Sequence, residues 1–343
     1  TPTDFVGVEG LAWSRAGDEV FFSAWTASFR LAVHRVTLGG KLRLALDGAG
    51  HLTMQDISSD GRWLITRDDQ PTRIRVRTPG ATGERIQGWL DNSVFPKLSR
   101  DGKLLAFSDQ SAGGGPHYSV MLRKVDGGLA ARLGEGNPTS FSPDGKWVLA
   151  YVPATPPRVM MYPTGPGTER NIDIGNLEHI TSAEWFRTSQ SILICGNEKD
   201  RAARCFVQSP NGGPLRPATP EGWTEGRVSP DERTILASLS AEEFRVFTIA
   251  GDSVRTIHGI APGEMVVRWS PDGRALWVRR VNSLKVDRLD IATGRRELIL
   301  DAPPQTTGGA MWFQPMWMTD DPNVYAYSAR EYVSYLFTVA GAK

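Results

Sequence analysis

The sequence predicts an all-β fold, a β-propeller of four-stranded antiparallel blades. A turn motif recurs eight times in the 343 residues, at successive spacings of 44, 41, 43, 44, 43, 41 and 49 residues. Within each interval, short apolar runs alternate with turns that contain Gly or Pro, and no long helical pattern appears. A repeat of about 43 residues indicates a unit that must stack on its neighbours. Four short strands per repeat are typical of a propeller blade.

Each repeat is anchored by a large apolar residue that precedes a polar turn. The fullest form is Phe-Ser-Pro-Asp-Gly at residues 141–145. This order favours a type I turn, because Pro presets φ, small polar side chains bond the backbone and Gly takes a left-handed position. We therefore interpret Ser142 as a turn residue and not as a nucleophile. The structural turn residues of the two fullest copies are Ser142, Asp144, Gly145, Asp272 and Gly273.

The other copies follow the same pattern with local departures. The sixth copy carries Glu232 in the Gly position, where we expect backbone strain, and the fifth has Phe186 in the Ser position. The tryptophans among the anchors are expected to pack between blades. The eight anchors are, in order, Trp13, Ile57, Leu98, Phe141, Trp185, Val228, Trp269 and Met318.

The strands of each unit follow from its anchor. An apolar run after the turn predicts a second strand; the eight runs lie at residues 20–22, 63–65, 104–106, 147–149, 192–194, 235–236, 275–277 and 324–326. A polar loop, an alternating third strand, a Gly turn and a short fourth strand complete the unit. We predict one domain over residues 1–343, with units at about 7–50, 51–92, 93–136, 137–176, 177–222, 223–260, 261–304 and 305–343.

The last unit contains only three predicted strands. Propellers avoid an open sheet edge, often by pairing strands from both ends of the chain. We expect Thr1 to Val6 to complete the eighth blade, or else a strand upstream of Thr1. A closed ring of eight blades is the prediction, and seven blades with a loose terminal unit is the alternative.

Composition limits the classes of partner. The net charge is +1, which gives no basic field for nucleic acid, and no apolar run is long enough to insert into a membrane. The two cysteines, Cys195 and Cys205, flank a polar loop between apolar runs and are expected to face each other across a hairpin. They are either two small buried residues or a disulfide.

Signatures of catalysis and of bound cofactors are absent from the sequence. It contains no Gly-x-Ser-x-Gly elbow, no His-Glu-x-x-His and no Cys/His cluster with zinc spacing. We therefore expect no catalytic residues, no metal and no cofactor.

The candidate ligand site lies in the loops at the mouth of the central channel. These loops join the second and third strands of a blade or lead from one blade to the next, and propellers bind ligands there. Opposite charges on one rim would suit a charged peptide or small ligand, whereas the alternative is a solvated loop surface. The candidate ligand-binding residues are Asp68, Asp109, His179, Glu198, Arg279, Arg280 and Arg330.

Three stretches carry a resemblance to known proteins. The repeats resemble TolB-like, WD-repeat-like propellers. More closely, residues 117–167 (HYSVMLRKVDGGLAARLGEGNPTSFSPDGKWVLAYVPATPPRVMMYPTGPG), DIATGRRELIL and YAYSAREYVSYLFTVAG resemble the C-terminal propeller region of bacterial eukaryotic-like serine/threonine protein kinases. The resemblance runs from about Gly7 to the end of the chain.

The resemblance implies a parent chain with an N-terminal cytoplasmic kinase domain, often a membrane helix, and a propeller that senses or scaffolds. It also implies an extracytoplasmic location for the propeller, with the cytoplasm as the alternative. The chain itself contains no kinase Gly-rich loop, His-Arg-Asp or Asp-Phe-Gly motif, so any kinase activity belongs to the parent.

Two classes of function follow from these observations. The first is a non-catalytic sensor or interaction propeller that binds an unidentified ligand or protein partner at the channel mouth. The alternative is a propeller enzyme, a lyase or hydrolase, that uses rim carboxylates in the channel. The absent catalytic signatures favour the first.

Overall fold

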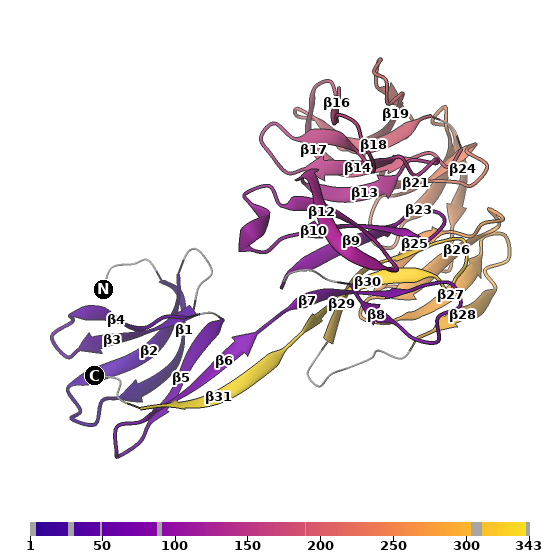
Figure 1. Cartoon of the computed structure of the whole chain (residues 1–343). Coiled ribbons are helices and arrows are strands. Elements are labelled where there is room, and N and C mark those ends of the chain that lie inside the picture. Colours follow the sequence, from indigo (N-terminus) through magenta and orange to yellow (C-terminus); the bar gives the residue numbers. More distant parts are fainter. Residues whose placement is uncertain are drawn as a thin grey trace. The chain divides into compact units, whose positions relative to one another are not determined.

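The computed structural model describes residues 5–26, 31–48, 50–87, 91–188, 190–302 and 311–340. Within these ranges the chain forms thirty-one β-strands and one short 3-10 helix, η1 (Ala112–Gly114) (Figure 1). The strands form seven four-stranded sheets and one three-stranded sheet. The all-β prediction is therefore confirmed, and the four-stranded antiparallel sheets are consistent with a propeller.

The chain divides into two compact units. Of the described residues, the smaller unit contains those from Phe5 to Pro71 and from Glu331 to Ala340, with Met311. The larger unit contains those from Thr72 to Ala302 and from Trp312 to Arg330. The sequence predicted one domain, because its repeat is the same throughout. The prediction of a single ring of eight blades is not confirmed.

The smaller unit contains two sheets. One has the order β1 (Phe5–Trp13), β2 (Glu19–Thr26), β3 (Leu31–Thr37) and β4 (Leu42–Leu46). The other has the order β31 (Val333–Val339), β6 (Trp63–Asp69) and β5 (His51–Ile57). Apolar side chains of both sheets form its core: Ala12, Phe21, Val33, Leu52, Met54, Trp63 and Ile65.

The larger unit contains six four-stranded sheets. One joins β29 (Met311–Met318), β30 (Tyr325–Glu331), β7 (Thr72–Arg77) and β8 (Arg85–Ile86). The next contains β9 (Ser93–Leu98), β10 (Leu104–Asp109), β11 (Ser119–Lys124) and β12 (Gly127–Glu135). A third contains β13 (Asn137–Phe141), β14 (Trp147–Val152), β15 (Arg158–Pro163) and β16 (Arg170–Ile172).

The remaining three sheets repeat this order along the chain. They contain β17 (Leu177–Trp185), β18 (Ile192–Glu198), β19 (Arg204–Gln208) and β20 (Arg216–Pro217); β21 (Thr224–Val228), β22 (Thr234–Ser238), β23 (Phe244–Thr248) and β24 (Ser253–Ile257); and β25 (Glu264–Trp269), β26 (Ala275–Arg280), β27 (Lys285–Asp290) and β28 (Arg296–Asp301). Successive sheets pack through apolar clusters, such as Leu149 on β14 with Ile192 on β18.

The first and last segments of the larger unit share one sheet. β30 pairs antiparallel with β7, from Tyr325 opposite Arg77 to Arg330 opposite Thr72. The sequence predicts that Thr1 to Val6 complete the final blade. Thr1 to Asp4 lie outside the described residues, and Phe5 and Val6 begin β1, which pairs with β2. The predicted unit at 51–92 is consequently divided, because β5 and β6 pair with β31 while β7 pairs with β30.

The turn after Phe141 has the geometry of a closed hairpin turn. The Gly145 N–H donates to the Ser142 carbonyl at 2.9 Å, and the Ser142 hydroxyl donates to Asp144 Oδ1 at 2.7 Å. Gly145 and Gly273 have φ of 70° and 68°, and Glu232 has φ of 58°. Glu232 of the sixth copy therefore has a side chain at a left-handed backbone position, which causes backbone strain.

The tryptophan anchors differ in their environment. Trp185 and Trp269 are buried, at 5% and 4% exposure, but Trp13 in the smaller unit is 54% exposed. The expectation of core packing is therefore wrong for Trp13. Cys195 and Cys205 lie directly opposite each other on β18 and β19 and form a disulfide. No helix among the described residues is long and apolar enough to cross a membrane.

Candidate binding pocket

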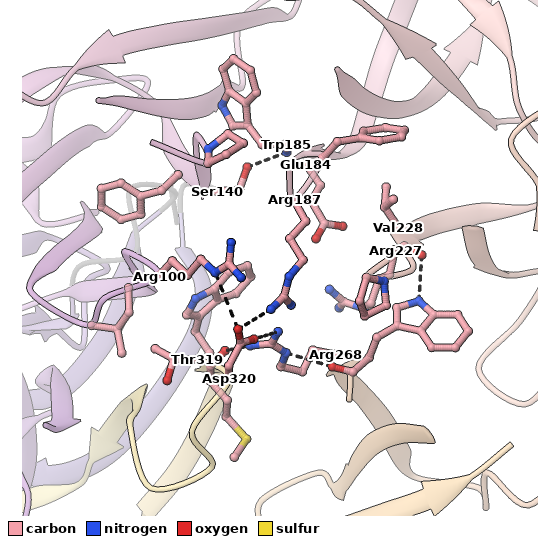
Figure 2. Close-up of a pocket in the computed structure, with 18 of the residues that line it drawn as sticks. Arg100, Ser140, Glu184, Trp185, Arg187, Arg227, Val228, Arg268, Thr319 and Asp320 are labelled. Carbon is pink, nitrogen blue, oxygen red and sulfur yellow. Dashed lines mark hydrogen bonds and ion pairs between the residues drawn. The ribbon is translucent and has the colours of Figure 1, made fainter. Parts of the chain in front are cut away.

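A pocket of about 150 Å³ lies in the larger unit where six strands from its six sheets end (Figure 2). These six strands, called the pocket strands below, are β9, β13, β17, β21, β25 and β29. Each contributes residues at or beside its anchor, such as Phe141 of β13 and Trp269 of β25. The repeat thus brings the residues around the anchor of each of the six sheets of the larger unit to a single cavity.

Strand alternation explains which side chains reach the pocket. Trp185 and Trp269 are buried, so the residues immediately before them, Glu184 and Arg268, face the other way. On the other pocket strands too, the residue one position before the anchor is expected to face away from the anchor's side. The residues directly before the six anchors of the larger unit are Lys97, Ser140, Glu184, Arg227, Arg268 and Trp317.

Three arginines surround one carboxylate in the pocket. Arg268 Nη2 donates to Asp320 Oδ1 at 2.7 Å, and Arg187 Nη2 donates to Asp320 Oδ2. Arg100 Nε lies 3.7 Å from the same oxygen, and all three guanidiniums converge on Asp320 in Figure 2. Burial alone would raise the pKa of Asp320, but the bonds from Arg187 and Arg268 outweigh it and hold the pKa below its ordinary value.

A second group of charges lies around Glu184. Burial raises the pKa of Glu184, against the opposing effect of the cations Arg227, Lys97 and Arg268. Burial also lowers the pKa of Lys97 to about 8, and Arg227 adds to that shift. The Lys97 ammonium lies 4.4 Å from the centre of the Trp317 ring. Glu184 and Lys97 are therefore both poorly solvated.

Arg227 differs from the other pocket arginines. Its guanidinium has no hydrogen bond and no ion pair within 4 Å among the described parts of the chain, although it lies half-buried in the lining. Its backbone carbonyl accepts a 3.0 Å bond from Trp269 Nε1, which fixes the strand that carries it. Arg227 is therefore held in place with an unused planar donor group.

The seven predicted ligand-binding residues lie elsewhere, and none of them lines the pocket. In the register of each sheet, Asp109 is opposite Ser93 and Arg280 is opposite Glu264, so these residues lie where the pocket strands begin. Asp68 belongs to the smaller unit, where it accepts a hydrogen bond from Ser334. The predicted rim site stays a prediction.

Several of these residues already have partners. Asp109 is buried and accepts a 2.9 Å bond from the Ser111 N–H. Arg279 is 3% exposed and donates to the Ser283 carbonyl at 3.0 Å, and burial lowers its pKa to about 10. Glu198 pairs with Arg201 at 3.4 Å, Arg330 donates to Thr72 at 3.3 Å, and His179 and Arg280 are exposed.

Among the described residues, no group of three or more His, Cys, Asp or Glu side chains is arranged to hold a metal ion.

Comparisons with known proteins give solved structures only. No protein-family model matches the chain, and no curated protein matches it. TolB from Acinetobacter baumannii is similar over 72% of this chain and 53% of its own, with 12% identity and a TM-score of 0.41. A structure from a study of two prolyl endopeptidases is similar over 91% and 52%, with 14% identity and a TM-score of 0.47. A putative TolB from Agrobacterium tumefaciens is similar over 62% and 80%, with 16% identity and a TM-score of 0.34.

The chain spans about half the length of the first two of these proteins. Two of these three structures are of a TolB or putative TolB protein.

Proposed function

We propose that this chain is a non-catalytic interaction domain that binds a ligand or protein partner in the pocket between the pocket strands. The observation that supports it best is the gathering of four arginines from four different sheets in one cavity that Trp317 also lines. Pockets with an apolar lining and a few fixed polar groups are typical binding sites.

The chemistry of the lining favours binding over catalysis. Guanidinium groups stay protonated at neutral pH and do not exchange protons with a substrate. Asp320 is already paired with arginines, which keeps it ionised and occupied. Asp109 and Glu198, two of the rim carboxylates that the enzyme alternative would use, are also bonded to neighbours.

The resemblance supports a finer proposal, that the chain is the C-terminal part of a bacterial receptor-like serine/threonine protein kinase. In that arrangement the pocket would act as a sensor for an extracytoplasmic ligand. Reading the coding sequence upstream of Thr1 tests this, because a kinase His-Arg-Asp loop is expected there. A coding sequence without kinase motifs would refute the kinase proposal without affecting the binding proposal.

A thermal-shift screen tests the interaction function. The library contains metabolites, metal ions and cell-wall fragments, and the proteins are the wild type, Arg227→Gln in the pocket and Arg280→Gln at the rim. We expect a ligand that raises the Tm of the wild type and of Arg280→Gln but not of Arg227→Gln. If only Arg280→Gln loses the shift in Tm, the ligand binds at the predicted rim. Chemical conversion of the ligand by the protein would refute the non-catalytic function.

A further inference from the structure

We infer that the pocket binds a carboxylate group attached to a small apolar body, with Arg227 as the residue that pairs with the carboxylate. This inference rests on the proposed function, because both require a ligand in the same pocket. It specifies the chemistry of the ligand, which neither the sequence motifs nor the comparisons assign.

The network around Asp320 shows what kind of anion these arginines accept. The two oxygens of Asp320 are divided between Arg268, at 2.7 Å on Oδ1, and Arg187 on Oδ2. A planar carboxylate with two acceptor oxygens thus already matches the donor geometry on this side of the pocket. The arginines are also held in place, because Arg268 Nη1 donates to the Met318 carbonyl at 2.7 Å.

Charge in the pocket is unbalanced in favour of cations. Among the described residues, its lining contains four arginines, Arg100, Arg187, Arg227 and Arg268, and two carboxylates, Glu184 and Asp320. Lys97 adds a further cation beside Trp317. Asp320 is occupied by its arginines, whereas Arg227 has no bonded partner among the described residues. A half-buried guanidinium without a hydrogen-bonded acceptor is unfavourable, and a ligand carboxylate would supply the missing acceptors.

Glu184 does not remove this imbalance. It is the carboxylate that interacts with Arg227, but it also interacts with Lys97 and Arg268, so one negative charge is shared among three cations. Burial raises its pKa, which means that its charged form is less stable here than it would be in water. A net positive charge therefore remains on the side of the pocket that contains Arg227.

The size and walls of the pocket limit the rest of the ligand. A cavity of about 150 Å³ is comparable to one that holds a benzene molecule. Trp317, which like Glu184 and Arg268 directly precedes an anchor, lines the pocket together with Pro143 and Pro230. The buried part of the ligand is therefore about the size of a benzoate ion or of one acidic side chain.

Titration calorimetry with benzoate, neutral benzamide and inorganic phosphate tests the inference on the whole chain. We expect benzoate to bind, benzamide to bind about tenfold more weakly or worse, and the benzoate affinity to fall as salt is added. Equal affinity for benzamide would overturn the inference by showing that the walls alone recognise the ligand. Tighter binding of phosphate than of benzoate, or no binding of benzoate, would overturn it as well.

Arg227→Gln and Arg227→Lys locate the carboxylate. We expect Arg227→Gln to lose about tenfold or more in benzoate affinity, and Arg227→Lys to retain an intermediate affinity because it keeps the charge without the planar donors. Arg295→Gln is the matched control, since Arg295 is exposed on a hairpin outside the lining. Unchanged affinity in a folded Arg227→Gln would overturn the assignment.

Asp320→Asn provides an independent variant if Arg227→Gln does not fold. Removing this charge frees Arg187 and Arg268, so benzoate should bind more tightly, whereas weaker or unchanged binding contradicts the inference. A Gly-Glu-Gly peptide with blocked ends, compared with its Gln counterpart, then distinguishes a protein side chain from a free organic acid as the source. If carboxylates fail while another ligand of the screen still depends on Arg227, the carboxylate inference is wrong and the proposed function stands.

Discussion

The hydroxyl of Tyr327 donates a 2.6 Å hydrogen bond to Glu84, 243 positions earlier in the sequence. The hydroxyl of Tyr325 donates to the other oxygen of the same carboxylate at 2.7 Å. Both tyrosines are on β30 and are buried, while Glu84 lies in the loop between β7 and β8. One carboxylate therefore satisfies two buried hydroxyls where the first and last strands of the larger unit share a sheet.

Removing this carboxylate should weaken the shared sheet. Glu84→Ala leaves two buried hydroxyls without an acceptor, and we expect the free energy of unfolding to fall by about 2 kcal/mol or more. Tyr327→Phe removes one donor only and should cost about 1 kcal/mol. Urea denaturation of both variants measures these changes. A loss below about 0.5 kcal/mol in Glu84→Ala would show that the bond pair does not stabilise the junction.

Acid should weaken the network around Asp320. The folded-state pKa of Asp320 lies below its ordinary value because of Arg187 and Arg268, so its contribution to stability is present above about pH 4 and is lost as pH falls through the folded-state pKa. We expect Asp320→Asn to reduce the acid dependence of the melting temperature below pH 4 relative to the wild type. Parallel curves of melting temperature against pH for the two proteins would contradict this assignment.

The local hairpins of this protein are readable from its sequence. The Ser-Pro-Asp-Gly turn fixes which residues pair next to it, and the Ser142 N–H indeed donates to the Trp147 carbonyl at 2.9 Å. The apolar runs predicted at 147–149 and 275–277 lie in strands β14 and β26. Cys195 and Cys205 were likewise expected to face each other, because a hairpin brings its flanking residues together.

The long-range pairing is not readable in the same way. Every repeat carries the same local pattern, so nothing in β7 indicates that it pairs with β30 rather than with β6. The pocket is not readable from the sequence for a related reason. Glu184, Arg227 and Arg268 each precede an anchor, and alternation turns them away from the core, but only the arrangement of six sheets gathers these positions around one cavity. The charged residues directly before the anchors are the feature of the sequence that could have indicated the pocket.

Gly145 isolates the backbone cost of a left-handed turn position. Its φ is 70°, and a Cβ built on it would meet nothing within 4 Å, so Gly145→Ala introduces no clash beyond the local backbone. We expect a loss of about 1 kcal/mol in stability. Ser142→Ala should cost a comparable amount, since the Ser142 hydroxyl is buried, donates to Asp144 and accepts from the Trp147 N–H. Thermal melts decide, and a neutral Gly145→Ala would contradict the strain argument.

Glu232 is the matched position in the sixth repeat, and there the effect should have the opposite sign. Its φ of 58° puts a side chain in the left-handed region, so Glu232→Gly should recover about 1 kcal/mol of backbone strain. The Glu232 carboxylate, however, accepts a hydrogen bond from the Thr188 N–H, which the substitution removes. Because that bond is exposed, its loss should offset only part of the gain, and we expect a net stabilisation below 1 kcal/mol.

Glu232→Asn, which tolerates the left-handed region, should fall between Glu232→Gly and the wild type in a thermal melt. If Glu232→Gly lowers the melting temperature, the bond to Thr188 outweighs the strain, and the side chain at this position is retained for the contact between repeats five and six.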